Sequence, residues 1–349
     1  MSVRSIVATV IICLPCFASA QGFAGLGSQA DGFAIPEKGY GLNFPADHGP
    51  HPNFRIEWWY LTANLKDDDG HDYGVQWTLF RSAISPGEDT GWSSPQLWMG
   101  HAGLTTPKHQ FYAERLARGG IGQAGVTAEP FAAWIDNWEM LGTDPTLNQL
   151  SLTASGSDFA YDLSMQAQGP LVLHGDAGYS VKSSGGQASY YYSQPRYDIS
   201  GTLTLPDGAV IVNGQGWLDR EWSSQPLADD QSGWDWFSLS FDSGEKLMGF
   251  ILRGDSGDYS SGTWIAADGS SKPLLPGAFQ AQPLTYSEVE GRTIPVQWQI
   301  KLPEHGVSAT IQAINDQSWM GTSFPYWEGP VTISGSHTGH GYLEMTGYD

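Results

Sequence analysis

The sequence is poor in cysteine and in long apolar segments. Its two cysteines, Cys13 and Cys16, both lie within the first twenty residues. The rest of the chain has none, which excludes a disulfide framework there and leaves core burial as the source of stability. After residue 20, no run approaches ~18 consecutive apolar residues, the length a membrane-spanning helix needs. We therefore expect no transmembrane segment in the mature chain.

Basic residues are also scarce. The chain has 16 Lys and Arg against 37 Asp and Glu, for a formal net charge of −21. Phosphate backbones and anionic headgroups repel such a protein, which excludes nucleic acid as a partner. The acidic residues are scattered through turns, so we interpret the charge as an aid to solubility.

The first twenty residues have the pattern of a leader. Arg4 precedes an apolar run over 6–17, and Ala18 and Ala20 supply the small residues that a signal peptidase requires before Gln21. We predict a signal peptide over 1–20 and a secreted or periplasmic protein. The following segment, 21–52, is rich in Gly, Pro and Asp and is expected to be an extended lead-in.

From residue 53 onward the pattern is typical of short strands separated by turns. Two β-rich runs flank the Asp-Gly turn near Gly70, and a second aromatic hairpin with the turn Asp242-Ser243-Gly244 begins near Trp234. No stretch keeps a helical period through several turns. We predict an all-β protein of antiparallel barrel or sandwich modules, an N-terminal one over 53–224 and a C-terminal one over 225–349.

Aromatic residues are abundant, with 15 Trp and 15 Tyr. Such rings line ligand cavities, but they also fill the cores of proteins made of strands. The run Tyr190, Tyr191 and Tyr192 alternates along a strand, which puts the first and third on one face. That pair either contacts a ligand or packs between the modules.

Several carboxylates stand among these rings. A buried carboxylate has its protonated form favoured, which suits general acid or base chemistry on an apolar substrate. The alternative is that each acid pairs with an arginine in a buried bridge. The acids are Glu57, Asp219, Glu221, Asp235, Glu328 and Glu344, and the arginines are Arg55, Arg81, Arg196, Arg220 and Arg253.

Two other motifs are interpreted as ordinary turns. The sequence Gly-Asp-Ser-Gly at 254–257 matches the surroundings of a serine-protease nucleophile, but no suitably placed His and Asp segments accompany it. His337 and His340 lie in a Gly-rich turn without a nearby third ligand. We expect neither a metal nor a cofactor.

A series of motifs spans the chain: Phe-Pro-Ala-Asp-His-Gly at 44–49, Glu-Trp-Trp-Tyr at 57–60, Trp-Leu-Asp-Arg-Glu-Trp at 217–222, Gly-Trp-Asp-Trp at 233–236, Tyr-Trp-Glu-Gly at 326–329 and Glu-Met-Thr-Gly-Tyr at 344–348. In this order they resemble the AttH-like proteins related to carotenoid 1,2-hydratase, also described as predicted secreted hydrolases. The resemblance implies two lipocalin-like modules and a hydrophobic ligand, an isoprenoid or a lipid. Carotenoid hydratases add water to a double bond without a cofactor.

The sequence departs from the hydratases at one position. Their motif carries a histidine near the position of Arg220, and an arginine stays protonated at neutral pH and cannot transfer a proton. Carotene hydration is therefore doubtful, although Asp219 or Glu221 could supply the proton in another reaction.

The resulting hypothesis is an exported protein that binds a hydrophobic small molecule, with hydratase or hydrolase chemistry at Asp219, Glu221 and Arg220. The alternative is a non-catalytic carrier that works with a membrane transporter. The residues expected to contact the ligand are Glu57, Trp58, Trp59, Tyr60, Gln76, Tyr190, Tyr192, Trp222, Trp234, Asp235, Trp236, Glu328 and Glu344.

The leader generates a first prediction. Protein recovered from its own organism should begin at Gln21, because signal peptidase cleaves after the small residue Ala20. Intact-mass measurement of the exported fraction tests this. A mass that includes residues 1–20 would contradict it.

Overall fold

The computed structural model describes residues 31–88, 91–225, 227 and 230–348. The predicted signal peptide and the start of the lead-in lie outside these residues. Within them the chain forms strands and three short 3-10 helices, η2 (Ala46–His48), η3 (Gly91–Ser93) and η4 (Pro303–His305). The all-β prediction is confirmed. None of the helices among the described residues has the length and apolar character needed to cross a membrane.

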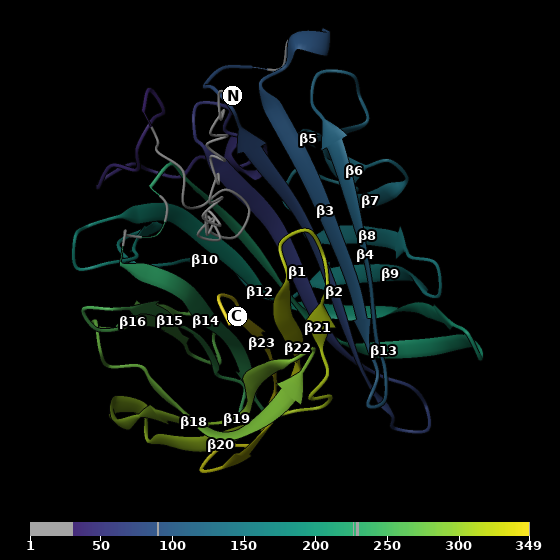
Figure 1. Cartoon of the computed structure of the whole chain (residues 1–349), viewed down its shortest axis with the longest axis vertical. Helices are drawn as coiled ribbons and strands as arrows, with labels where there is room; N and C mark the ends of the chain where they lie inside the picture. Colours follow the sequence, from purple (N-terminus) through teal and green to yellow (C-terminus); the bar gives the residue numbers. More distant parts are fainter. Residues whose placement is uncertain (1–30, 89–90, 226, 228–229, 349) are drawn as a thin grey trace, which may run out of the picture.

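The strands form two antiparallel sheets (Figure 1). The first contains β1 (Ile56–Lys66), β2 (Asp72–Ala83), β3 (Gln96–Thr105), β4 (Gln110–Arg118), β5 (Ala124–Ala128), β6 (Phe131–Ile135), β7 (Trp138–Gly142), β8 (Gln149–Ser155), β9 (Ala160–Ala167), β10 (Val172–Leu173), β11 (Tyr179–Val181), β12 (Ala188–Leu205) and β13 (Gly208–Ser223). The second contains β14 (Gln231–Phe241), β15 (Lys246–Gly254), β16 (Tyr259–Ile265), β17 (Ser271–Pro273), β18 (Gln280–Val289), β19 (Arg292–Leu302), β20 (Val307–Ala313), β21 (Trp319–Met320), β22 (Tyr326–Gly335) and β23 (Gly339–Met345).

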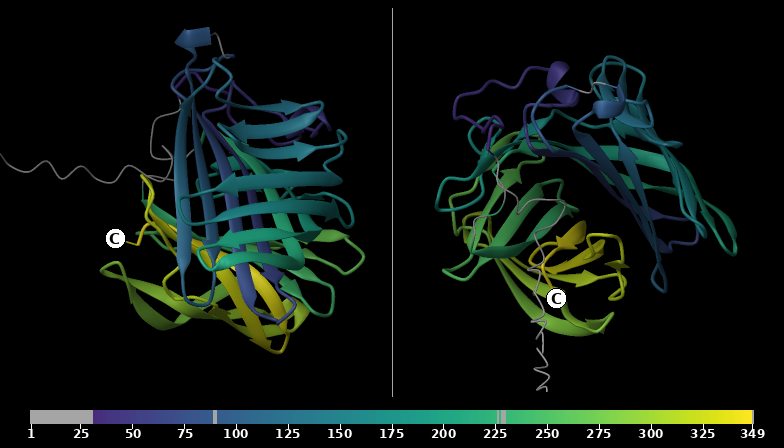
Figure 2. Two further views of the ribbon diagram at one scale, coloured as in Figure 1. Left: turned by 90° about the vertical axis from the view of Figure 1, so that its right-hand side faces the viewer. Right: turned by 45° about the horizontal axis from the view of Figure 1, so that its top comes forward.

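Both sheets are arranged in the same way around their first strand. In the first sheet β1 lies between β2 and the last strand, β13, and in the second β14 lies between β15 and the last strand, β23. The two aromatic hairpins are therefore central in their sheets. Both sheets are strongly curved, and the second curls toward a closed barrel beneath the first (Figure 2). This agrees with two lipocalin-like modules.

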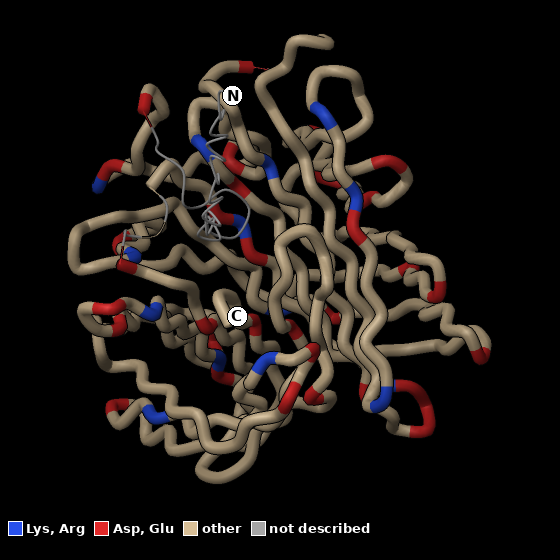
Figure 3. The backbone as a smooth tube through the Cα atoms, in the orientation of Figure 1, with Lys and Arg blue, Asp and Glu red and all other residues tan. Residues whose placement is uncertain are grey.

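Burial explains why the strands differ in sequence pattern. Strands β8 and β9 alternate buried and exposed residues because one face meets water. The central strands β1 and β13 are buried on both faces along the half that meets the second sheet. Acidic residues lie mostly in the loops of both sheets and form no single patch (Figure 3).

Among the described residues, aromatic rings pack in four places, one of which is a cluster of Tyr190, Tyr192 and Trp222 against the lead-in. One core fills the first module around Trp59 and Trp77, and another fills the second around Trp298. A separate cluster lies between the sheets and joins Tyr60 and Tyr191 of the first to residues of the second, among them Trp236, Phe250 and Tyr342. Core filling therefore accounts for many of the rings, and a further group of rings forms the contact between the modules.

A buried ion network holds the lead-in onto the first sheet. Each carboxylate oxygen of Glu57 accepts a hydrogen bond from an arginine, Arg81 on β2 and Arg220 on β13. His51 adds its backbone N–H at 2.9 Å and its ring Nδ1 at 3.1 Å. Burial opposes ionisation of Glu57, but the two arginines outweigh it and hold its pKa well below the usual value. The guanidinium of Arg220 also lies 3.8 Å from the ring centre of Trp59.

This network predicts a large stability effect. Glu57→Gln leaves two buried guanidinium groups without their shared counter-charge, so we expect a loss of about 3–5 kcal/mol in the free energy of unfolding. Urea denaturation measures it. The control is Lys66→Met, which removes the exposed ion pair with Asp72 and should cost less than about 1 kcal/mol. Equal effects of the two substitutions would contradict the structural role of Glu57.

Candidate functional site

A pocket lies where the two sheets meet. Its volume is about 110 Å³. For comparison, an engineered cavity of about 150 Å³ holds one benzene molecule. The pocket therefore has room for a ring or for one short branched segment of a longer ligand. Its lining comes from both modules: Ile56, Glu57, Trp58, Tyr60, Thr78, Phe80, Arg81, Ser82, Lys182, Ser189, Tyr191, Asp219, Glu221, Ser223, Gln225, Leu227, Trp234, Trp236, Phe250, Leu252 and Glu344.

Most of the pocket wall is aromatic or aliphatic. Trp58 and Phe80 come from the first hairpin, and Trp234 and Trp236 come from the second. The ring centre of Trp236 lies 5.2 Å from that of Tyr60 in an edge-to-face arrangement, which joins the two modules directly. Such a wall excludes water from groups that face it and offers faces of negative potential to a cation.

Two carboxyl groups lie at one end of the pocket, and the first of them, Asp219, is buried. Its carboxyl accepts hydrogen bonds from Tyr191 at 2.7 Å, from Trp217 Nε1 at 2.6 Å and from the Ser193 hydroxyl. Burial raises the pKa of Asp219 to about 7, although these hydrogen bonds favour the ionised form. Asp219 therefore titrates near neutral pH.

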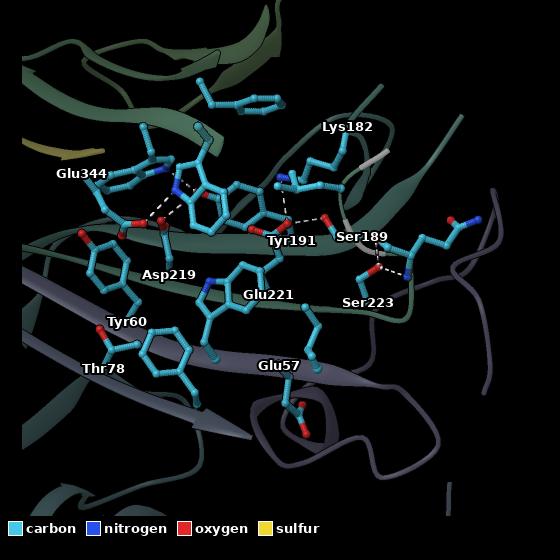
Figure 4. Close-up of a pocket in the computed structure, with 18 of the residues that line it drawn as sticks. Glu57, Tyr60, Thr78, Lys182, Ser189, Tyr191, Asp219, Glu221, Ser223 and Glu344 are labelled. Atoms are coloured by element: carbon cyan, nitrogen blue, oxygen red, sulfur yellow. Dashed lines mark hydrogen bonds and ion pairs between the residues drawn. The ribbon is translucent and has the colours of Figure 1, made fainter. Parts of the chain in front are cut away.

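Glu344 is the second carboxyl group, and it comes from the other module. Figure 4 shows its side chain and that of Asp219 converging on the same end of the pocket. The indole of Trp234 donates a hydrogen bond to Glu344 Oε1 at 2.7 Å. Burial raises the pKa of Glu344 to about 7, and the charges of Asp219 and Glu221 add to the rise.

A third acid, Glu221, differs because it has a cationic partner. Lys182 Nζ lies 2.8 Å from Glu221 Oε1, and the hydroxyl of Ser189 donates to the same oxygen. The ammonium also stands over the rings of Tyr191 and Phe250, at 4.7 and 4.5 Å from their centres. The part of the pocket formed by Lys182, Glu221 and Ser189 is therefore polar, and the positive charge of Lys182 balances the negative charge of Glu221.

Alternation along β13 separates the three residues expected to be catalytic. Asp219 and Glu221 face the pocket, whereas Arg220 lies between them in sequence and points to the opposite face. There it pairs with Glu57, whose carboxylate also turns away from the pocket although the residue borders it (Figure 4). Arg220 and the Glu57 carboxylate therefore belong to the ion network that holds the lead-in, on the side of the sheet away from the pocket.

The same alternation sorts the three tyrosines of β12. Tyr191 lines the pocket, while Tyr190 and Tyr192 lie on the other face with Trp222, packed against the lead-in. Tyr192 contacts His48 Nδ1 at 2.6 Å through its hydroxyl. The expected pair is thus together, but beneath the lead-in and outside the pocket.

Three further expected residues, Glu328, Gln76 and Trp59, do not line the pocket. Glu328 is directly opposite Glu344 on the neighbouring strand and accepts a hydrogen bond from Tyr60. Burial raises its pKa well above the usual value. Gln76 donates to Thr78 and, at 3.4 Å, to Tyr326. Trp59 belongs to the core of the first module.

Asp235 has a structural environment of its own. It pairs with Arg253 at 2.5 Å and accepts a hydrogen bond from the Tyr348 hydroxyl at 2.9 Å. Burial raises the pKa of Asp235 to about 6 despite the neighbouring arginine. Trp234 and Trp236, on either side of it in sequence, point to the pocket.

Several pocket residues carry no signal in the sequence. Lys182 belongs to a polar segment that resembles any loop, Ser189 directly precedes the tyrosine run of 190–192 without being distinguished by it, and Phe250 belongs to an ordinary apolar strand. They reach the pocket only because the two sheets dock. Among the described residues, one group could hold a metal by geometry, Asp67, Asp69 and His71 in the turn after β1, and it has no connection to the pocket.

Comparisons with known proteins agree with this architecture. The family model of AttH-like proteins matches residues 35–348. A solved structure from Nitrosomonas europaea described as an AttH protein has 31% sequence identity and a TM-score of 0.81, over 90% of this chain and 99% of that chain. Kievitone hydratase from Nectria haematococca has 15% identity and a TM-score of 0.67, over 92% and 97%, a likeness in fold alone. No curated protein matches the sequence. The chain belongs to the AttH-like family.

Proposed function

We propose that the pocket binds an apolar small molecule, of the isoprenoid or lipid class, and adds water to one of its double bonds without a cofactor. One observation carries this proposal: two carboxyl groups face the same ring-lined pocket, Asp219, which is buried, and Glu344, which is partly buried, and the pKa of each is raised to about 7. Addition of water to an alkene needs a group that gives a proton and a group that takes one. The name of the structural relative kievitone hydratase supports the choice of reaction class.

The surroundings of the two carboxyl groups assign their roles. Asp219 accepts three hydrogen bonds, which stabilise its ionised form. Once Asp219 is ionised, its charge raises the pKa of Glu344. We therefore assign to Glu344 the proton that the pair holds at neutral pH. Glu344 is the acid and Asp219 is the base.

The reaction then balances within the pocket. Glu344 gives its proton to one alkene carbon, and the neighbouring carbon becomes cationic. The rings of Trp58, Trp234 and Trp236 stabilise this cation through their faces. A water molecule attacks the cation and loses a proton to Asp219. The cycle closes when the proton returns from Asp219 to Glu344.

The dimensions of the pocket restrict the ligand. A volume of about 110 Å³ holds the reacting end of an isoprenoid and not a whole carotenoid. The polar end formed by Lys182, Glu221 and Ser189 suits a hydroxyl or carbonyl group near the reacting end. Short acyclic isoprenoid alcohols and unsaturated fatty acids are therefore the substrates to test first.

The central prediction concerns Glu344. With geraniol and oleic acid as probes, the wild type should yield a product heavier by one water, with deuterium on carbon when the solvent is D₂O. Glu344→Gln keeps the shape of the side chain but removes the proton, so the rate should fall by roughly 10²–10⁴-fold while the dissociation constant stays within about twofold. Mass spectrometry and quenching of tryptophan fluorescence measure the two quantities.

The control for this experiment is Asp162→Asn, which removes an exposed carboxylate on β9. It should behave as the wild type. If the wild type binds a probe tightly and releases every probe unchanged, the second candidate function holds. That candidate is a non-catalytic carrier that works with a membrane transporter outside the cytoplasm, and the ring-lined pocket serves it equally well.

The raised pKa values also predict how stability depends on pH. Asp219 and Glu344 bind protons more tightly in the folded state than in the unfolded state, so their contribution is fully present below about pH 4 and is lost as the pH rises through about 7. Glu344→Gln removes the part of this loss of stability that comes from the ionisation of Glu344. Relative to wild type, the variant should gain stability between about pH 4.5 and 7.5, by at most about 1.4 kcal/mol per pH unit.

Urea denaturation at a series of pH values measures this difference. A constant difference between the two proteins across that range would show that Glu344 does not titrate there.

A further inference from the structure

Asp219 is connected to the second sheet by a chain of hydrogen bonds outside the pocket lining. The Ser193 hydroxyl contacts Asp219 Oδ1 and lies 2.6 Å from His174 Nε2. On the other side of the imidazole, His174 Nδ1 lies 2.8 Å from the Thr263 hydroxyl. Thr263 belongs to β16 of the second sheet, whereas the other three residues belong to the first module.

Local structure fixes each member of this chain. Ser193 on β12 is directly opposite Asp219 on β13. His174 follows β10, which pairs with β12, and its backbone N–H donates to the Tyr191 carbonyl at 3.0 Å. The imidazole packs on the Tyr191 ring with 4.1 Å between the ring centres. The ring of His174 is therefore held from both ends and from one face.

Burial makes these hydrogen bonds obligatory. His174, Ser193 and Thr263 are each 0% exposed, and Asp219 is 2% exposed. Polar groups at such depth depend on protein partners because bulk water does not reach them. Burial also holds the pKa of His174 well below its usual value, and the charge of Lys182 adds to this effect. The imidazole is neutral and carries one N–H.

The direction of each hydrogen bond follows from the ionised carboxylate. An ionised Asp219 only accepts, so the single hydroxyl proton of Ser193 points to it. His174 must then carry its proton on Nε2 and donate it to the Ser193 oxygen. Its bare Nδ1 accepts from Thr263. Every group in the chain donates toward Asp219, an alignment in which each bond strengthens the next.

We propose that Thr263, His174 and Ser193 are positioning residues that keep Asp219 ionised and oriented as the base of the pocket. The base is complete only when the second sheet supplies Thr263. The term base rests on the proposed function. The hydrogen-bond relay itself rests on the geometry of these four residues.

Other charged and titratable groups also face the relay. Tyr191 donates to Asp219 from β12, Glu221 lies two residues further along β13, and Glu344 faces Asp219 from β23. Lys182 acts on His174. Substitution of Thr263 leaves all four in place, so a change in Asp219 reports on the relay alone.

The decisive experiment changes one hydroxyl in the second module and observes a carboxyl group in the first. Thr263→Val keeps the shape of the side chain but removes the donor to His174, and Thr263→Ser is the matched control that keeps the hydroxyl. The titration of Asp219 is followed by carboxyl ¹³C NMR of the full chain and assigned with Asp219→Asn. Thr263→Val should raise the midpoint by roughly 0.5–1 pH unit, and Thr263→Ser should leave it near the wild-type value.

A second pair of variants tests the imidazole. The amide of His174→Gln can donate to Ser193 and accept from Thr263, whereas His174→Leu can do neither. The Asp219 titration midpoint of His174→Gln should lie closer to the wild-type value than that of His174→Leu. In the wild type, ¹⁵N NMR should show the proton of His174 on Nε2.

The outcomes separate the relay from the proposed reaction. If Thr263→Val and Thr263→Ser give the same Asp219 midpoint, or if the proton of His174 lies on Nδ1, the relay is wrong even when turnover is observed. If the midpoints shift as expected but no probe is hydrated, the relay stands and the hydratase proposal fails. Where turnover is measurable, kcat should rise with pH as Asp219 ionises. Thr263→Val should shift the apparent pKa of this rise upward by the same amount and leave KM unchanged.

Discussion

The contact between the ring-covered faces of the two sheets is the interaction on which the rest of this structure depends. Tyr60 and Tyr191 from the first sheet pack against Trp236 and Phe250 from the second. Each such ring contributes about 1.5–3 kcal/mol when it leaves water. The same burial places carboxyl groups of two modules in a medium of low polarity, which is why the pKa values of Asp219 and Glu344 are raised. Without the contact, neither carboxyl group would have this property.

Strand β13 has a different purpose on each of its faces. On one face Arg220 and Trp222 hold the lead-in through Glu57 and the packed rings beneath it. On the other face Asp219 and Glu221 point to the pocket. Because side chains alternate along a strand, neighbouring residues of one motif act in separate environments. Arg220 thus contributes to stability and leaves the pocket to its neighbours Asp219 and Glu221.

The sequence was sufficient for the strands, the two aromatic hairpins and the grouping of Tyr190 with Tyr192. These depend on turn residues and on a period of two, which are local properties. The sequence could not predict which face of each strand lines the pocket, because this depends on how the two sheets dock. The same holds for Lys182 and His174, whose roles come from residues far away in the chain. A buried histidine beside a short strand has no sequence signature.

The most direct test of the account is a neutron diffraction structure of the ligand-free protein at neutral pH, in which the protons of the pocket are visible. The account places one proton on Glu344 and none on Asp219, with the Ser193 hydroxyl pointing to Asp219. A proton on Asp219 together with an ionised Glu344, or protons on both, would contradict the assignment of acid and base.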